Sequence, residues 1–212
     1  MNSFRAILTK EKQLIRRTKK KNIIGLCIFS AVYPIILDYI FPYGALFELM
    51  FFIPSLLMVI DLTTNSMIKD NEDQMLQMLF CHDLNKMDIN IGKSIMPMFY
   101  GCLSLAISLT INVLLISLSL DAILMAIIIG ILIMGFAIFA SIFLSLFRMR
   151  REHYFLLNGL VIYLTYNYLL LLFFSNHIIL LIAFMALIIV FVLLCYFRLS
   201  ALETKLHFRE DS

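Results

Sequence analysis

The sequence predicts an all-α membrane protein with six transmembrane helices and both termini in the cytoplasm. Three observations lead to this prediction: the composition, the length of the apolar blocks and the placement of the cations. The chain of 212 residues is 62% hydrophobic, with a mean hydropathy of +0.97, whereas a soluble domain is about 45–50% apolar. One core of this size cannot bury so much apolar surface, so we expect lipid to surround the helices.

The apolar sequence falls into three blocks, at residues 22–62, 91–147 and 154–197. Each block is about twice the ~20 residues that a helix needs to cross ~30 Å of hydrocarbon. Each block is therefore expected to form a hairpin of two transmembrane helices. The expected helices cover residues 22–40, 46–62, 95–116, 123–144, 155–173 and 178–196.

The 17 Lys and Arg residues lie before, between or after these blocks, or at their inner edges. If both ends of every hairpin are cytoplasmic, all of these cations are cytoplasmic, as the positive-inside bias predicts. Short outer turns are then expected at residues 41–45, 117–121 and 175–177. The net charge of +3 reflects this topology and the attraction of anionic lipid headgroups, and it does not indicate a nucleic-acid partner.

Residues 1–21 are expected to form an amphipathic elbow helix ahead of a transmembrane domain of residues 22–212. Phe4, Ile7 and Leu8 have the i, i+3, i+4 spacing of one helical face, among many basic residues. A basic amphipathic helix before a span is expected to lie flat in the headgroup layer. The alternative is an unstructured basic tail. At the other end of the chain, residues 198–212 are expected to form a cytoplasmic tail.

The inner loop at residues 63–90 is expected to contain a short helix. Asn71 and Gln74 resemble a capping box, and Glu72 and Asp73 lie in the first turn, where the helix dipole favours anions. The following apolar stripe has the spacing of one helical face. It consists of Met75, Leu76, Leu79 and Phe80. Together these features predict an amphipathic helix over residues 71–80 on the cytoplasmic side.

An exposed apolar stripe of this kind needs something to cover it. It either rests on lipid headgroups or docks into a groove on a cytoplasmic protein. Residues 71–84 contain acidic side chains and neither Lys nor Arg. Because an anionic leaflet would repel such a segment, we favour a protein partner.

This loop resembles the coupling segment of type-2 ATP-binding-cassette permeases. The matching positions are Glu72, Leu76, Leu79, Phe80, Leu84, Asn85, Lys86, Asp88, Ile89, Gly92 and Lys93. A basic elbow helix, six spans and two cytoplasmic ends are similar to that family over nearly the whole chain, whereas the motif itself is confined to residues 70–94. Gln74, Met75 and Asp83 stand where the family has glycine, threonine and proline.

The resemblance implies that the chain is the permease subunit of an exporter. In that family the coupling helix inserts into a separate ATPase subunit, which binds ATP and Mg²⁺, so this chain would hold no cofactor of its own. The coupling residues implied are Glu72, Asp73, Leu76, Gln77, Leu79 and Phe80. Because one coupling helix serves one ATPase, a second permease subunit is expected, either the same chain or a sister chain.

The sequence predicts no catalytic site. Gly92, Lys93 and Ser94 end like a Walker A loop, but Met87 stands where that loop needs a glycine. The spans contain no HExxH, GxSxG or paired-carboxylate arrangement, and the four cysteines form no CxxC pair. We therefore expect neither an enzyme nor a metal-binding protein.

The expected span at residues 155–173 is rich in uncharged polar residues. Asn158, Tyr163 and Tyr166 are candidates for lining a substrate pathway, although such residues also form ordinary hydrogen bonds between helices. With such short outer turns, the chain looks like permeases that export bacteriocins, lantibiotics or other amphipathic peptides, including cytolytic peptides that act in virulence. Its richness in Ile, Asn, Lys, Phe and Met suggests the plasma membrane of a Gram-positive bacterium. The alternative function is a non-transporting immunity or signalling protein.

Overall fold

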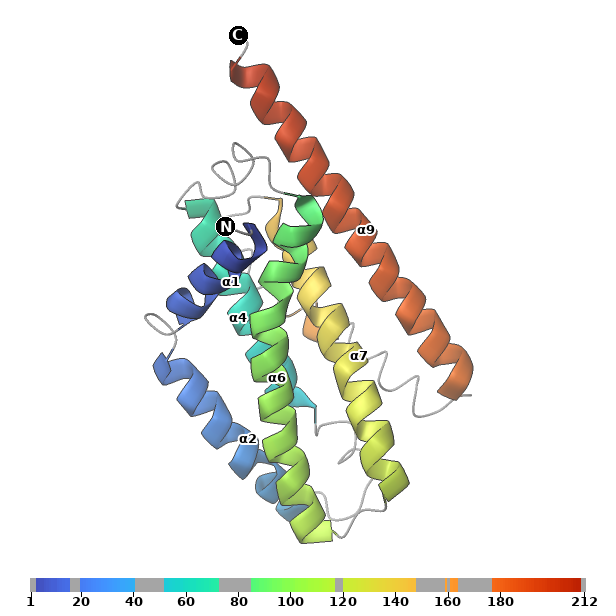
Figure 1. Cartoon of the computed structure of the whole chain (residues 1–212). Helices are drawn as coiled ribbons and strands as arrows, with labels where there is room; N and C mark the ends of the chain where they lie inside the picture. Colours follow the sequence, from blue (N-terminus) through green and yellow to red (C-terminus); the bar gives the residue numbers. More distant parts are fainter. Residues whose placement is uncertain are drawn as a thin grey trace.

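The computed structural model describes residues 3–15, 20–40, 52–72, 85–116, 120–147, 159, 161–163 and 177–210. Every element within these ranges is helical, so the prediction of an all-α protein is confirmed for the described part of the chain. The elements are α1 (Ser3–Leu14), α2 (Lys20–Ile40), α4 (Ile53–Glu72), α6 (Lys86–Ile116), α7 (Leu120–Ser145) and α9 (His177–Glu210), shown in Figure 1.

Three of these helices contain a stretch that is long and apolar enough to cross a membrane. The stretches are Lys86–Leu114 in α6, Ala126–Ser145 in α7 and Ile182–Leu202 in α9, and α2 adds the shorter apolar stretch Lys21–Ile36. This confirms apolar, span-length helices in the second and third predicted blocks. Most of the expected span at residues 155–173 lies outside the described residues, so six spans stay a prediction.

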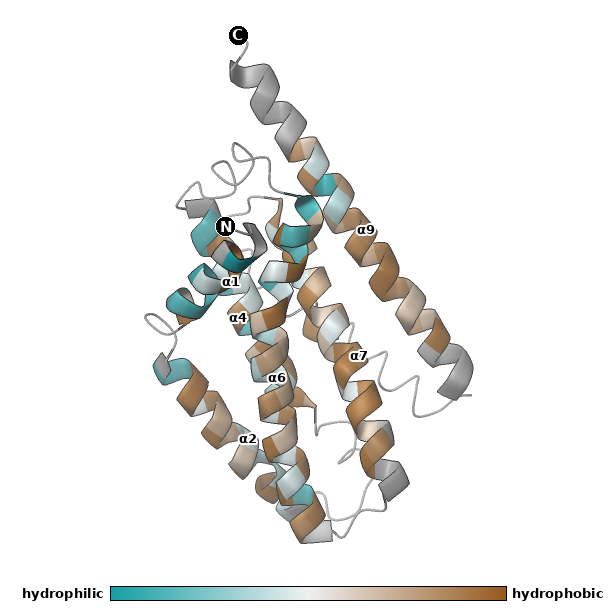
Figure 2. Cartoon of the chain, viewed as in Figure 1, coloured by the Kyte–Doolittle hydropathy of each residue, from teal (hydrophilic) through white to brown (hydrophobic). Residues whose placement is uncertain are grey.

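The helices α2, α4, α6 and α7 alternate in direction along the chain, and α9 runs the same way as α7 (Figure 1). In Figure 1, α2 and α6 run downward, whereas α4, α7 and α9 run upward. The last turns of α4 and α9, the first turn of α6 and all of α1 therefore lie at one end of the bundle. Figure 2 shows hydrophilic residues gathered at this same end and apolar residues along the rest of the helices. We call it the polar end.

Helix α4 lies at the centre of the bundle. Its buried positions face in all directions around the helix, from Met58, Val59 and Ile60 to Thr63 and Thr64. A helix that is surrounded by protein can carry polar residues, because neighbouring helices supply their hydrogen-bond partners. This explains why α4 remains helical beyond Leu62, where the apolar block ends.

The loop predicted at residues 63–90 is much shorter in the structure. Helix α4 continues to Glu72, so no helix begins at Asn71, and the predicted capping role of Asn71 is wrong. Helix α6 begins at Lys86 rather than near residue 95. At its start, the side-chain Oδ1 of Asn85 accepts a hydrogen bond of 3.1 Å from the backbone N of Met87, as an N-cap does. Residues 73–85 separate the two helices, and of these residues 73–84 lie outside the described part of the chain.

Glycines allow the closest approaches between helices. A Cβ atom added at Gly101 of α6 would lie 2.4 Å from Cγ2 of Val59 in α4 and 2.7 Å from Sδ of Met134 in α7. A Cβ atom at Gly130 of α7 would lie 2.7 Å from Cδ2 of Leu105 in α6. Small residues at such crossings are typical of helices that pack in lipid, where close van der Waals contact replaces the hydrophobic driving force.

Candidate functional site

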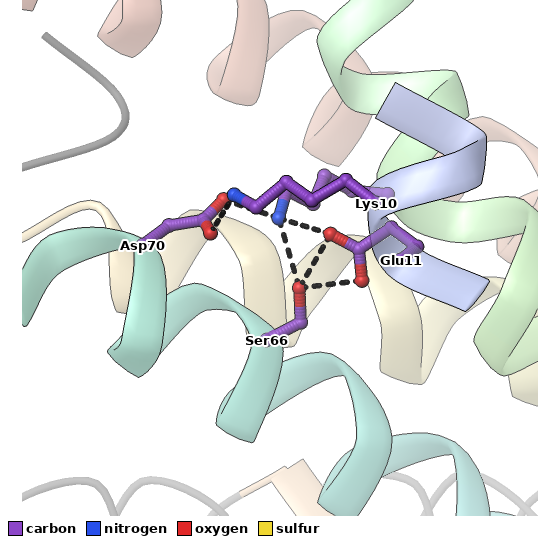
Figure 3. Close-up of polar contacts among 5 residues, drawn as sticks. Lys10, Glu11, Ser66 and Asp70 are labelled. Atoms are coloured by element: carbon purple, nitrogen blue, oxygen red, sulfur yellow. Dashed lines mark hydrogen bonds and ion pairs between the residues drawn. The ribbon is translucent and has the colours of Figure 1, made fainter. Parts of the chain in front are cut away.

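Four charged side chains from three helices meet at the polar end of the bundle. Lys10 and Glu11 come from α1, Asp70 comes from α4, and Lys93 comes from α6 (Figure 3). Together with Ser66 of α4 we call them the charge cluster. The side chains of Glu11, Asp70 and Lys93 are each only 1% exposed, whereas that of Lys10 is 24% exposed. Two cations face two anions, so the buried charge is balanced.

Lys93 is the centre of the charge cluster. Its Nζ forms ion pairs with Oε1 of Glu11 and Oδ2 of Asp70, and it donates a hydrogen bond of 2.9 Å to Oγ of Ser66. Oγ of Ser66 lies 2.9 Å from Oε1 and 2.8 Å from Oε2 of Glu11. Nζ of Lys10 pairs with the other carboxylate oxygen of Asp70. Lys93 therefore joins all three helices at one atom.

The sequence positions these groups through helical spacing and one glycine. Glu11 lies four residues from both Ile7 and Ile15, and all three side chains are buried on the same face of α1. Helix α1 can approach α6 at Gly92, where an added Cβ atom would lie only 2.8 Å from Cγ2 of Ile7. This approach brings Glu11 within reach of Lys93, the next residue along α6.

The charge cluster makes the relative positions of three helices energetically important. Taking ions out of water is unfavourable, and their attraction offsets this only when every group has a partner. Removing one member of a buried pair typically destabilises a protein by about 3–5 kcal/mol, whereas apolar residues of similar size can replace a whole pair with little loss. The cluster thus strongly disfavours any arrangement that separates α1, α4 and α6.

A second polar group lies deeper in the bundle and contains only serines. Oγ of Ser30 in α2 lies 2.6 Å from Oγ of Ser104 in α6, and Ser55 of α4 donates to the same Ser104 oxygen at 3.4 Å. Ser108 of α6 donates to the backbone oxygen of Ser30 at 2.9 Å. Each such bond between transmembrane helices contributes only about 0.6 kcal/mol. These serines therefore join α2, α4 and α6 by packing and modest hydrogen bonds.

Of the predicted site residues, only Glu72 and Tyr163 lie within the described part of the chain. Glu72 is the last residue of α4, whereas the other predicted coupling residues lie outside the described residues; they are Asp73, Leu76, Gln77, Leu79 and Phe80. The same is true of Asn158 and Tyr166 in the predicted substrate pathway. Tyr163 is described and is 65% exposed, so it lies on the outer surface of this chain.

Reasoning from sequence missed the charge cluster. Ser66 and Asp70 fall within the predicted inner loop at residues 63–90, and Lys93 matches the permease motif and a Walker-like ending, neither of which predicts a buried ion pair. One signal could have revealed the cluster. Glu11 interrupts the apolar row formed by Ile7 and Ile15, and an acidic residue on the buried face of a helix needs a buried cation.

Comparisons of the chain with protein-family models, with curated proteins and with solved structures give no match.

Proposed function

We propose that this chain is the membrane subunit of an ATP-driven exporter and that residues 73–84 dock into a separate ATPase subunit. One observation carries the proposal. The segment leaves α4 two residues after Asp70 and returns seven residues before Lys93, and these two side chains form an ion pair. A segment that transmits force needs firm attachment at both ends, and the charge cluster supplies that attachment. The segment itself has acidic residues and an apolar stripe, which suit docking into a groove on a protein.

The proposed mechanism uses the chain as a mechanical partner of the ATPase. ATP and Mg²⁺ bind to the ATPase subunits, which close on one another and draw two docked segments together. The transmembrane bundles then rock and open a path outward. Because each chain carries one docking segment, the exporter contains two permease subunits, either two copies of this chain or this chain and a sister chain.

The proposed cargo is an amphipathic peptide, exported across the plasma membrane of a Gram-positive bacterium. Asn158, Tyr163 and Tyr166 are the proposed lining of its pathway. The exposed side chain of Tyr163 supports a pathway that a second subunit completes, because this residue does not face the core of its own chain. Tyrosine suits such cargo, since its ring packs on apolar groups and its hydroxyl remains able to form hydrogen bonds.

Truncation of two apolar anchors tests the docking segment. Leu79→Ala combined with Phe80→Ala is expected to lose the ATPase on purification and to abolish substrate-stimulated ATP hydrolysis, because buried anchors at an interface are worth about 2 kcal/mol or more each. The matched control is Phe99→Ala combined with Leu103→Ala, since these side chains of α6 are exposed on the outside of the bundle. The control is expected to retain the ATPase.

Two other outcomes would replace the proposal. If the Leu79 and Phe80 variant keeps its ATPase and its stimulated hydrolysis, residues 73–84 are not the docking segment. If the wild-type chain purifies from its native membrane with no ATPase, the exporter proposal is replaced by the alternative, a non-transporting immunity or signalling protein.

A further inference from the structure

We propose that α1 belongs to the moving part of the exporter. In this view α1, the last turns of α4 and the first turns of α6 form one rigid unit, which carries the displacement of residues 73–84 into the transmembrane bundle. The inference rests on the proposed function and adds a role to α1, for which the sequence suggested only a position at the membrane surface.

Helix α1 is attached to the bundle at three successive levels. Ile7 packs directly against Gly92 of α6. One turn further on, Glu11 pairs with Lys93 and is hydrogen-bonded to Ser66. After another turn, Ile15 is buried in a core group with Ile23, Met58 and Leu62. The inner face of α1 is therefore covered by protein along its length, and the helix cannot move far without moving its partners.

The chemistry of the attachment favours a unit that moves as a whole. Apolar contacts between helices can slide by small steps, because dispersion attraction is spread over many atoms. Lys93 instead has three buried partners on two other helices. A change in the angle between α1, α4 and α6 would leave a buried ion without a partner, which is strongly unfavourable. The three helix ends therefore keep their relative positions when force acts on them.

The location of the unit matches this role. Asp70 lies in the last turn of α4, and Lys93 lies in the second turn of α6. Force applied to residues 73–84 reaches both of these residues within one or two helical turns. Because Lys10 and Glu11 hold the same two residues, α1 receives the force at the same point and stiffens the connection to the bundle.

The first test removes one anion and one cation together. Glu11→Gln combined with Lys93→Gln keeps the cluster neutral and leaves the pair of Lys10 and Asp70 in place. The purified complex with its ATPase is placed in vesicles, and ATP-driven uptake of a fluorescent amphipathic helical peptide is measured. We expect uptake to fall about tenfold or more, within the range of ordinary coupling between sites, while the ATPase stays bound and hydrolysis continues. Lys12→Gln, an exposed position on the same helix, is expected to leave uptake unchanged.

The second test fixes α1 to α6 covalently. In a cysteine-free background, Ile7→Cys and Gly92→Cys place two Cβ atoms near the distance of about 3.5–4.5 Å that a disulfide needs, since a Cβ atom built at Gly92 lies 3.3 Å from Cβ of Ile7. Copper phenanthroline is expected to cross-link this pair in isolated membranes, whereas the pair Lys12→Cys and Gly92→Cys stays separate. The cross-linked complex is expected to transport the peptide as fast as the reduced complex, because the unit is already rigid.

The possible results separate the two proposals. Normal uptake in the Glu11 and Lys93 variant, a failure of the 7–92 cross-link, or transport that stops on cross-linking and returns on reduction would each overturn the rigid unit. None of these results touches the transporter proposal if the wild-type complex contains an ATPase and transports the peptide. A wild-type preparation without an ATPase contradicts the proposed function itself.

Discussion

At the scale of single residues, the most unusual feature is a lysine buried among helices. Lys93 is 1% exposed, and it is tolerated because Glu11, Asp70 and Ser66 satisfy its ammonium group from α1 and α4. The energetic consequence is asymmetric. Removing one charged side chain leaves its partner buried without an opposite charge, which is strongly destabilising. Removing a cation and an anion together leaves no such unpaired charge, so the loss of stability is smaller.

This asymmetry gives a measurable prediction. Lys93→Gln alone leaves Glu11 with only Ser66 and gives the cluster a net negative charge, so we expect a loss of about 3–5 kcal/mol of stability. Glu11→Gln combined with Lys93→Gln is expected to recover much of that loss, because charge balance is restored. Thermal unfolding in detergent, followed by size-exclusion chromatography, measures both variants against Lys12→Gln, which changes an exposed residue. A double variant less stable than the single one would show that charge balance does not govern this site.

At the scale of the helices, packing depends on where the backbones come close. Helix α6 is held between α4 and α7 at Gly101, where Val59 and Met134 occupy the space that a side chain would need. Gly25 of α2 has no atom within 4 Å of an added Cβ. Both glycines lie within helices, and they differ in how closely other residues approach the added Cβ atom, so we compare the effect of the same substitution at the two positions.

We expect Gly101→Ala to destabilise the protein by about 1–3 kcal/mol, the usual effect of forcing an extra carbon into a packed contact. We expect Gly25→Ala to be neutral or stabilising by up to about 1 kcal/mol, because alanine loses less backbone entropy in a helix. The midpoint of thermal unfolding in the same detergent compares the two variants. Equal midpoints would mean that α6 does not pack this closely between α4 and α7.

The sequence predicted where most helices lie, but it did not predict that α4 continues to Glu72 or that α6 begins at Lys86. A long apolar segment in lipid forms a helix, because each backbone N–H and C=O group must find a hydrogen-bond partner within the segment. This is why α2, α6, α7 and α9 could be predicted from the sequence. The extensions of α4 and α6 depend on Asp70 and Lys93, which find their partners on helices distant in sequence. Hydrophobic periodicity marks Glu11 as an acidic residue in an apolar row, but it does not identify the partners of Glu11 on α4 and α6.

At the scale of the whole molecule, the direction of the helices agrees with the distribution of charge. The hydrophilic residues gather at the polar end (Figure 2), where α1, the last turn of α4 and the first turn of α6 meet. The positive-inside bias therefore favours the polar end as the cytoplasmic one. The end of α4 and the start of α6, which residues 73–84 connect, lie at this end, as the proposed docking to a cytoplasmic ATPase requires.

Labelling of single cysteines in intact cells tests this orientation. In a cysteine-free background, an impermeant thiol reagent is expected to modify Asn176→Cys and to leave Asp83→Cys and Arg150→Cys unmodified until the cells are opened. The reason is that residue 176 belongs to a predicted outer turn, whereas residues 83 and 150 belong to predicted inner connections. Labelling of position 83 or 150 in intact cells, with position 176 protected, would reverse the topology.

As an exporter subunit, the chain is proposed to move a peptide outward with energy supplied by a partner ATPase. The most direct measurement is uptake of a fluorescent amphipathic helical peptide by inside-out membrane vesicles that contain the chain and its ATPase. The account predicts that the peptide accumulates only when ATP and Mg²⁺ are present and that accumulation is lost when Leu79 and Phe80 are both changed to alanine. Accumulation that is absent with ATP, or unchanged in that variant, would contradict the account.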